Sequence, residues 1–151
     1  MSHPYRSRLV ADPEYLRALG QAFYKFTYLE WVVVWTIVKL SPDGFASVPR
    51  VKTASEIARA LTNAISGAAP PLPEPLRRQL VKFDEAYRAG IRTRNKLLHA
   101  HPYTAPSGQP ELMGGGHTWS PDQVDRAAQE FEEAAIFGNT VFHGPLAAAR
   151  P

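Results

Sequence analysis

The feature that most constrains the fold is one long helical pattern, which begins at Asp12-Pro13-Glu14 and ends at Ser41-Pro42-Asp43-Gly44. Aspartate suits an N-cap, proline the first helical position, and glutamate the first turn. The second half of the pattern, WVVVWTIV, is apolar on all sides. A strand would suit this stretch alone, but the pattern before it favours a buried helix or a dimer face. Apolar residues recur at helical spacing throughout, at Leu16, Leu19, Phe23, Phe26, Val33 and Ile37.

Two more helices are expected in the middle of the chain. One opens with Thr53 and Glu56 at capping-box spacing and ends near Ser66-Gly67. After a stiff, proline-rich connection, the next runs from about Pro75 to His99, because Pro102 disfavours helix at the residue before it. Its expected buried stripe consists of Leu76, Leu80, Phe83, Tyr87, Ile91 and Leu98.

A fourth helix is expected to start at Ser120-Pro121, where Gln123 completes a second capping box. Between the last two long helices, residues 102–119 are rich in glycine and proline, which predicts a loop or short hairpin. The Gly114-Gly115-Gly116 run there lacks the lysine of a phosphate loop. The residues that the fourth helix is expected to bury are Val124, Ala128, Phe131, Ala135 and Phe142.

These elements predict an all-α bundle of four to five helices in a single domain, residues 1–151. Its core is expected at about 12–143, with a flexible tail at 144–151. The chain has no cysteine, which excludes disulfides and cysteine-ligated zinc and makes a reducing cytoplasm the expected location. The longest apolar run, 31–38, is too short to span a membrane, and residues 1–10 lack the apolar core of a signal peptide.

Charge is unevenly distributed along the chain. Residues 77–96 carry seven basic and two acidic side chains, whereas residues 122–133 carry five acidic and one basic. Two solvated faces that attract each other in a bundle would explain this pattern. The net charge of +3 does not by itself indicate a nucleic acid partner.

The basic segment ends in Arg94-Asn95-Lys96-Leu97-Leu98-His99, near the end of the third helix. Cleavage of RNA by its own 2′-hydroxyl requires a proton acceptor, positive charge beside the phosphorane, and a proton for the leaving 5′-oxygen. Histidine can act as base or acid near neutral pH, and arginine offers a donor fork that matches phosphate oxygens. Asparagine can orient either group, and neither a metal nor another cofactor is needed. A histidine at a helix end can equally do no more than interact with the last carbonyls.

Helix geometry separates these residues. At 100° per residue, Asn95 lies about 40° from His99, and Arg92 nearly superimposes on His99. Arg94 lies about 140° from His99, nearer the buried stripe. Arg94 must therefore reach around the helix or act in a site shared with another subunit.

The motif resembles the signature of the HEPN superfamily (higher eukaryotes and prokaryotes nucleotide-binding domains). That signature is an arginine, a polar residue that is often asparagine, three further residues and a histidine. Arg94, Asn95 and His99 match it position by position. HEPN domains are helical bundles with the motif toward the end of a late helix, so the resemblance in architecture extends over about residues 12–143.

The resemblance implies a metal-independent endoribonuclease that leaves 2′,3′-cyclic phosphate ends. Arg94 would clamp the phosphate, Asn95 would orient, and His99 would be the general base or acid. It also implies a homodimer with a shared active-site cleft, acting as a toxin or phage-defence effector, with a cognate antitoxin as a partner. Other members of the superfamily only bind nucleotides or partners, so an RNA-, nucleotide- or partner-binding module is the alternative. A helical interaction protein with a coincidental motif is a third hypothesis.

Auxiliary roles in RNA binding or proton transfer are expected for Arg88, Arg92, Lys96 and His101. In one toxin subgroup a tyrosine two residues after the motif histidine is the site of inactivating modification. Here that position is His101, and Tyr103 follows two residues later, so the resemblance does not extend to this regulation. His101 is either a second proton-transfer group or a surface histidine.

Other candidate sites carry less support. His117 and His143 do not combine with His99 or His101 at the i, i+4 spacing of metal ligands, so no metal is expected. Glu30 is either a buried functional carboxylate or the exposed edge of the first helix. Four aromatic residues could stack on bases, although core and dimer packing explain such residues more often: Tyr24, Tyr28, Trp31 and Trp35.

Overall fold

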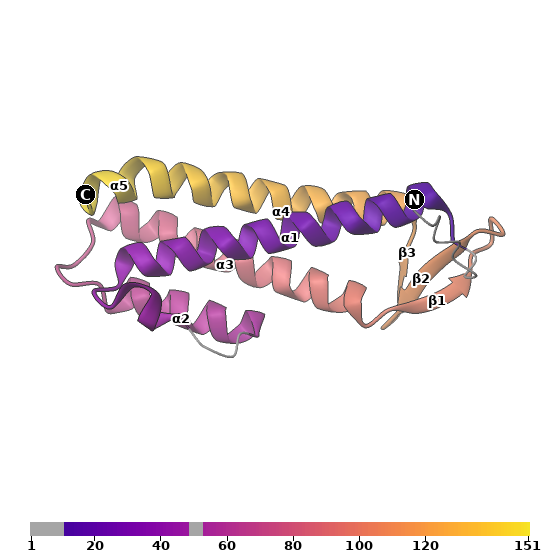
Figure 1. Cartoon of the computed structure of the whole chain (residues 1–151), viewed down its shortest axis with the longest axis horizontal. Helices are drawn as coiled ribbons and strands as arrows, with labels where there is room; N and C mark the ends of the chain where they lie inside the picture. Colours follow the sequence, from indigo (N-terminus) through magenta and orange to yellow (C-terminus); the bar gives the residue numbers. More distant parts are fainter. Residues whose placement is uncertain (1–10, 49–52) are drawn as a thin grey trace, which may run out of the picture.

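The computed structural model describes residues 11–48 and 53–151. Three long helices run along the molecule, a shorter helix packs beside them at one end, and a small sheet lies at the other (Figure 1). Helices α1 (Pro13–Leu40) and α4 (Pro121–Val141) pack side by side and run in the same direction, while α3 (Glu74–Leu98) runs in the opposite one. The prediction of a helical bundle is confirmed. The expectation about a signal peptide concerns residues 1–10, which lie outside the described residues.

Helix α1 begins and ends where its sequence signals predict. The carboxylate of Asp12 accepts a hydrogen bond from the backbone N–H of Tyr15 at 3.0 Å. At the other end, the N–H of Ser41 donates to the carbonyl of Ile37 at 3.0 Å, and a short 3-10 turn, η1 (Gly44–Ser47), follows.

The second half of α1 is a core helix with one aromatic face toward solvent. Val32, Val33 and Val34 are buried, whereas Trp31 and Trp35 are 50% and 39% exposed. The apolar stretch is therefore not buried on all sides. Farther toward the N-terminus, Leu16 and Phe23 belong to the apolar pattern but also lie at the surface, as do Tyr24 and Tyr28.

Helix α2 (Ala54–Ser66) opens with the predicted capping box, in which Thr53 and Glu56 exchange hydrogen bonds. A polar network joins α2 to α3. The buried carboxylate of Asp84 accepts hydrogen bonds from Thr62 Oγ1 at 2.6 Å and from Arg88 Nε at 3.0 Å. Arg88 also donates to Thr62 Oγ1 and to the carbonyl of Ala58. Because a buried carboxylate is costly unless it is paired and hydrogen-bonded, this network fixes how α2 sits on α3.

Helix α3 buries its predicted stripe except at the C-terminal end. Leu76, Leu80, Phe83, Tyr87 and Ile91 are buried as predicted. Leu98 is 52% exposed, so the prediction that it is buried is wrong; Leu97 packs against the core instead. Figure 1 shows that the C-terminal part of α3 diverges from α1. The buried stripe of α3 is therefore no longer covered by α1 where it reaches Leu98.

Residues 101–119 form a three-stranded antiparallel sheet, where the sequence predicted a loop or short hairpin. Its strands are β1 (His101–Thr104), β2 (Pro110–Gly114) and β3 (His117–Trp119), in the order β1-β2-β3. Gly115 and Gly116 make the two-residue turn between β2 and β3, with φ of 60° and 74°. Positive φ at both central positions is typical of a tight hairpin turn. The description all-α therefore applies to the bundle but not to this segment.

Tyr15 docks the sheet onto α1. Its hydroxyl donates to the carbonyl of Trp119 at 2.6 Å and accepts from the N–H of Leu112 at 3.0 Å. Burial raises the pKa of Tyr15, so the hydroxyl keeps the proton that it donates.

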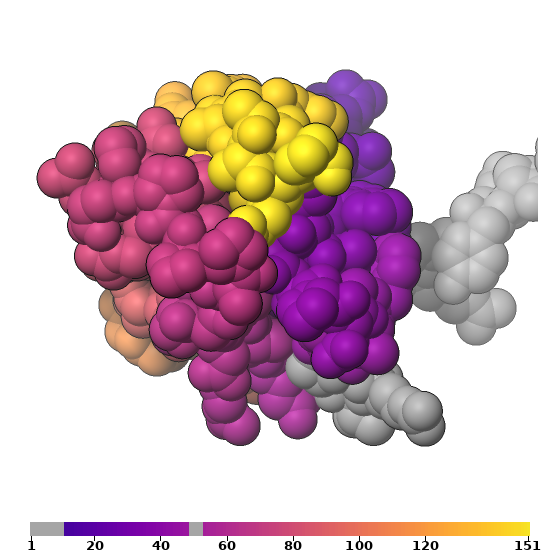
Figure 2. Space-filling view, turned by 90° about the vertical axis from the view of Figure 1, so that its left-hand side faces the viewer, coloured from indigo at the N-terminus to yellow at the C-terminus, as the bar shows by residue number. Residues whose placement is uncertain are grey.

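Helix α4 starts at Ser120, whose hydroxyl accepts from the N–H of Gln123 at 3.3 Å. Its predicted core residues are buried, except for Phe142, which is half-buried. The chain continues through a π-helical turn, η2 (Phe142–Leu146), into α5 (Ala147–Ala149). Leu146 is fully buried, so the core extends beyond the predicted limit at residue 143. Figure 2 shows this end of the molecule, where the C-terminal segment, the end of α1 and the α2–α3 connection lie together.

The acidic segment of α4 contacts α1 and α3 in different ways. Glu132 forms an ion pair with Lys25 of α1 at 2.8 Å, while Glu130 accepts hydrogen bonds from Thr93 of α3 at 3.0 and 3.3 Å. Among the described residues, no ion pair joins the basic segment of α3 to the acidic segment of α4. Within the same part of the chain, no helix is both long enough and apolar enough to cross a membrane.

Candidate active site

The predicted motif lies where α3 ends and the chain turns into β1. Arg94 and Asn95 are half-buried in the last turns of α3, and His99 is the exposed residue that follows the helix. The backbone N–H of His99 donates to the carbonyl of Asn95 at 3.0 Å, which closes the last turn. The sequence therefore brings all three residues to one end of the bundle.

Arg94 lies against α1. Its guanidinium carbon is 5.3 Å from the centroid of the Phe26 ring, within the range of a cation–π contact. One terminal nitrogen, Nη1, donates to Oδ1 of Asn95 at 2.9 Å. The Nε atom is buried and has no hydrogen-bond partner among the described residues. Arg94 thus faces the core side of α3, as the helix geometry predicted.

His99 lies on a different side of α3 from Arg94. Its side chain is exposed, and among the described residues no hydrogen bond joins it to Arg94. Neighbouring Leu98 is a large apolar residue that is half in solvent. Within one chain, the contacts of Arg94 among the described residues are with Asn95 and Phe26 rather than with His99.

The predicted auxiliary residues fall into two groups. Arg92, Lys96 and His101 are exposed around the motif, and His101 is the first residue of β1. Arg88 is instead held by Asp84, Thr62 and the Ala58 carbonyl. Its hydrogen bonds point to a structural role, and sequence spacing gave no signal of the α2 partners that hold it.

A second polar contact, between Tyr87 and Glu30, lies beside Arg94. The hydroxyl of Tyr87 donates to Oε2 of Glu30 at 2.8 Å, and the Tyr87 side chain is fully buried. Burial raises the pKa of Tyr87, and the nearby Glu30 carboxylate raises it further, whereas the Arg94 guanidinium opposes the shift. Glu30 is half-buried, which lies between the two alternatives from the sequence, a buried functional carboxylate and an exposed residue at the edge of the helix.

Tyr87 was predicted only as a core residue, although its spacing carried a further signal. Tyr87 and Arg94 are seven residues apart on α3, so they lie about 20° apart around the helix axis. That spacing places a phenol two turns before the guanidinium on the same face. Glu30 could not be assigned to this pair from the sequence, because the contact depends on how α1 crosses α3.

His117 and His143 lie outside the motif. In the described part of the chain, no group of three or more histidine, aspartate and glutamate side chains could hold an ion. His117 lies instead against Trp119 of the same strand, with ring centroids 4.5 Å apart. His143 stacks edge-on against Phe142 near the C-terminus.

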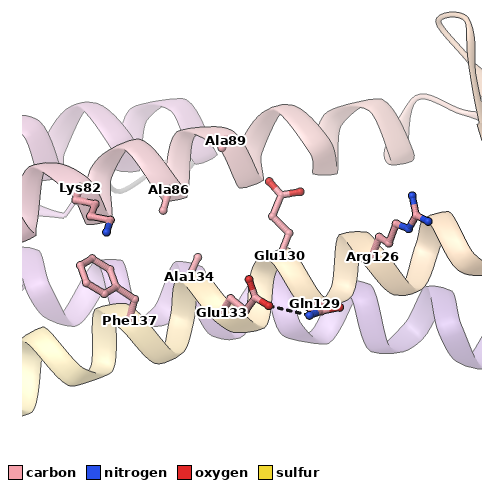
Figure 3. A pocket seen from close by; sticks show the side chains of 9 residues that line it. All are labelled: Lys82, Ala86, Ala89, Arg126, Gln129, Glu130, Glu133, Ala134 and Phe137. Carbon is pink, nitrogen blue, oxygen red and sulfur yellow. Dashed lines mark hydrogen bonds between the residues drawn. The ribbon is translucent and has the colours of Figure 1, made fainter.

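A groove between α3 and α4 lies away from the motif. It has a volume of about 550 Å³ and a floor of small residues, Ala86, Ala89 and Ala134. Figure 3 shows Lys82 and Phe137 at one end and Arg126 at the other, with Glu130 extending from α4 toward α3. None of Arg94, Asn95 and His99 lines this groove, so its shape provides no support for the motif.

Comparison of the chain with models of known protein families, with curated proteins and with solved structures found no match.

Proposed function

We propose that this protein is a metal-independent endoribonuclease of the HEPN type. His99 takes the proton of the 2′-hydroxyl or returns one to the 5′-oxygen, and Arg94 offsets the negative charge of the phosphorane. Attack of the 2′-oxygen breaks the bond from phosphorus to the 5′-oxygen and leaves a 2′,3′-cyclic phosphate. The observation that supports the proposal is the hydrogen bond from Arg94 to Asn95 in the last turns of α3, the helix that the exposed His99 directly follows.

The chemistry requires Arg94 and His99 to act on one phosphate, although they lie on different sides of α3. A homodimer with a shared cleft supplies the arrangement, because Arg94 of one copy then serves His99 of the other. An exposed apolar side chain in the motif supports this assembly, since Leu98, next to His99, is 52% exposed. Analytical ultracentrifugation tests it directly, and a strict monomer would contradict it.

Subunit complementation tests whether the cleft is shared. Arg94→Ala and His99→Ala proteins are each expected to be inactive. Once subunits have exchanged, a mixture should regain activity, because a mixed dimer contains one site with both residues intact. A mixture in which subunits demonstrably exchange but activity does not return would place both residues in a single-chain site.

Expression in cells tests the proposed toxin or phage-defence role in the cytoplasm. Wild type is expected to slow growth and degrade cellular RNA, whereas His99→Ala protein at equal abundance does neither. His143→Ala is the matched control, since it also removes an exposed imidazole but from outside the motif. If wild type is no more toxic than the His99 variant and leaves RNA intact, the nuclease proposal fails. A cognate antitoxin would be recognised as a partner that relieves the toxicity of wild type.

One observation favours a second candidate, a non-catalytic module that binds RNA, a nucleotide or a partner protein. Arg94 packs against Phe26 and is half-buried, which a structural arginine would also do. This candidate predicts RNA binding without cleavage in a protein whose dimer is intact. Product analysis after long incubation separates the two functions.

A further inference from the structure

A second cleft lies at the sheet end of the molecule, where α3, β3 and α4 meet. It has a volume of about 180 Å³ and is lined by residues from all three elements. It shares Arg126 and Glu130, both labelled in Figure 3, with the α3–α4 groove, so the two hollows adjoin along α4. Its wall on α3 includes Lys96, three residues before His99.

Most of the polar groups in this cleft are hydrogen-bond donors. Lys96 and Arg126 are both exposed, and neither forms an ion pair with a described residue. His117 and Gln123 add donor capacity from β3 and from the first turn of α4. The start of a helix also carries partial positive charge. The one acidic residue in the lining is Glu130, whose carboxylate already accepts from the Thr93 hydroxyl at 3.0 and 3.3 Å.

Trp119 provides an independent indication of a missing acceptor. It forms part of the cleft wall and is only 2% exposed. Its indole Nε1 is buried, and no described residue forms a hydrogen bond with it. Folded proteins rarely leave such a donor unpaired, since an unmet buried donor is costly. A donor in the wall, together with the cationic side chains of Lys96 and Arg126, favours an anion over a cation in the cleft.

We propose that this cleft binds a phosphate group. Phosphate supplies several acceptor oxygens and a charge that suits Lys96 and Arg126. The group belongs either to the backbone of RNA or to a free nucleotide, which share this chemistry. Lys96 lies about 60° from His99 around the axis of α3 and about 4.5 Å along it. An RNA backbone that occupies the motif therefore reaches the cleft within a few nucleotides. The assignment of the phosphate to RNA rests on the proposed function, whereas the binding of phosphate by the cleft does not.

The indole N–H signals of the three tryptophans provide a direct readout by NMR. The protein is titrated at constant ionic strength with inorganic phosphate, with adenosine monophosphate, and with a 2′-O-methyl oligoribonucleotide that cannot be cleaved. We expect a saturable shift of the Trp119 signal, with Trp31 and Trp35 unaffected by inorganic phosphate. Tighter binding of the oligonucleotide than of the mononucleotide identifies RNA as the source, and the reverse order identifies a nucleotide.

Charge variants test the assignment of the site. Lys96→Ala and Arg126→Ala should each weaken phosphate binding about tenfold, as expected for loss of one charge-assisted contact. Glu130→Gln should strengthen it. Arg78→Ala is the matched control on α3, about 27 Å away along the helix, and should change nothing. A Trp119 signal that does not saturate, or that responds equally in the Lys96, Arg126 and Arg78 variants, would overturn the proposal. His99→Ala should bind phosphate normally, so failure of the nuclease function and failure of this site are distinguishable.

Discussion

Replacing Tyr87 by phenylalanine tests the contact that links α1 to α3 beside the motif. The change keeps the buried ring and removes only the hydroxyl, which donates to Glu30 at 2.8 Å. A hydrogen bond to a charged group contributes about 1.5–3 kcal/mol. Because Glu30 is half-buried and water can replace the lost donor, we expect the lower end, about 1.5 kcal/mol. For a domain of this size, that corresponds to a melting temperature about 3–6 °C lower.

Urea unfolding followed by far-UV circular dichroism measures this loss. Tyr103→Phe is the matched control, because that hydroxyl also faces a glutamate, Glu111, but at 3.5 Å and near the surface. It should leave stability unchanged. A double-mutant cycle with Glu30→Gln should give a coupling energy of about 1 kcal/mol between positions 30 and 87.

The reasoning would be refuted by a Tyr87→Phe protein as stable as wild type. It would be refuted equally by two single changes whose effects simply add. Either result would mean that Glu30 and Tyr87 do not interact in solution, and that the packing of Arg94 between α1 and α3 is not supported by this contact.

Two further predictions concern stability. Burial raises the pKa of Tyr87 above its ordinary value of about 10, so above that pH the unfolded chain has lost a proton that the folded protein keeps. The free energy of unfolding should therefore fall as pH rises above about 10. Tyr87→Phe should reduce the slope of that free energy against pH by up to about 1.4 kcal/mol per pH unit. Equal slopes for the two proteins, measured by urea unfolding at a series of pH values, would contradict this. Gly138→Ala would place a Cβ 2.3 Å from Cζ of the fully buried Phe83, so we expect a loss of about 1–3 kcal/mol by thermal unfolding. Gly20→Ala is the control, because nothing lies within 4 Å of its added Cβ, and it should stabilise α1 by about 0.5–1 kcal/mol. A Gly138→Ala protein as stable as wild type would contradict the prediction and show that Phe83 can move aside.

Local signals in the sequence predicted the helices well because three of the four longer helices, α1, α2 and α4, begin with a side-chain N-cap. Asp12, Thr53 and Ser120 all act as N-caps, and each accepts the backbone hydrogen bond that its spacing implied. The sheet was underestimated because its three strands are only three to five residues long and alternate too briefly for a periodic pattern. Gly115 and Gly116 indicate a tight hairpin turn, but Gly114 directly before them made this turn harder to recognise in the sequence.

The candidate site was predicted less completely, since it depends on contacts between helices. The position of Arg94 on the core side of α3 followed from a simple angle, and the structure agrees with it. Its partner Phe26, the Tyr87–Glu30 hydrogen bond and the role of Arg88 in holding α2 depend on how helices cross, which local spacing does not determine. Leu98 was misplaced for the same reason, because α3 diverges from α1 at its end.

The most direct test of the central claim is cleavage of a defined RNA by purified protein in excess EDTA. The account predicts that wild type produces fragments ending in 2′,3′-cyclic phosphate, as shown by mass spectrometry, and that His99→Ala and Arg94→Ala do not. His143→Ala protein, carried through the same purification, should cleave like wild type. RNA that stays intact with dimeric wild type, or cleavage that EDTA abolishes, would contradict the claim that Arg94 and His99 form a metal-independent ribonuclease site.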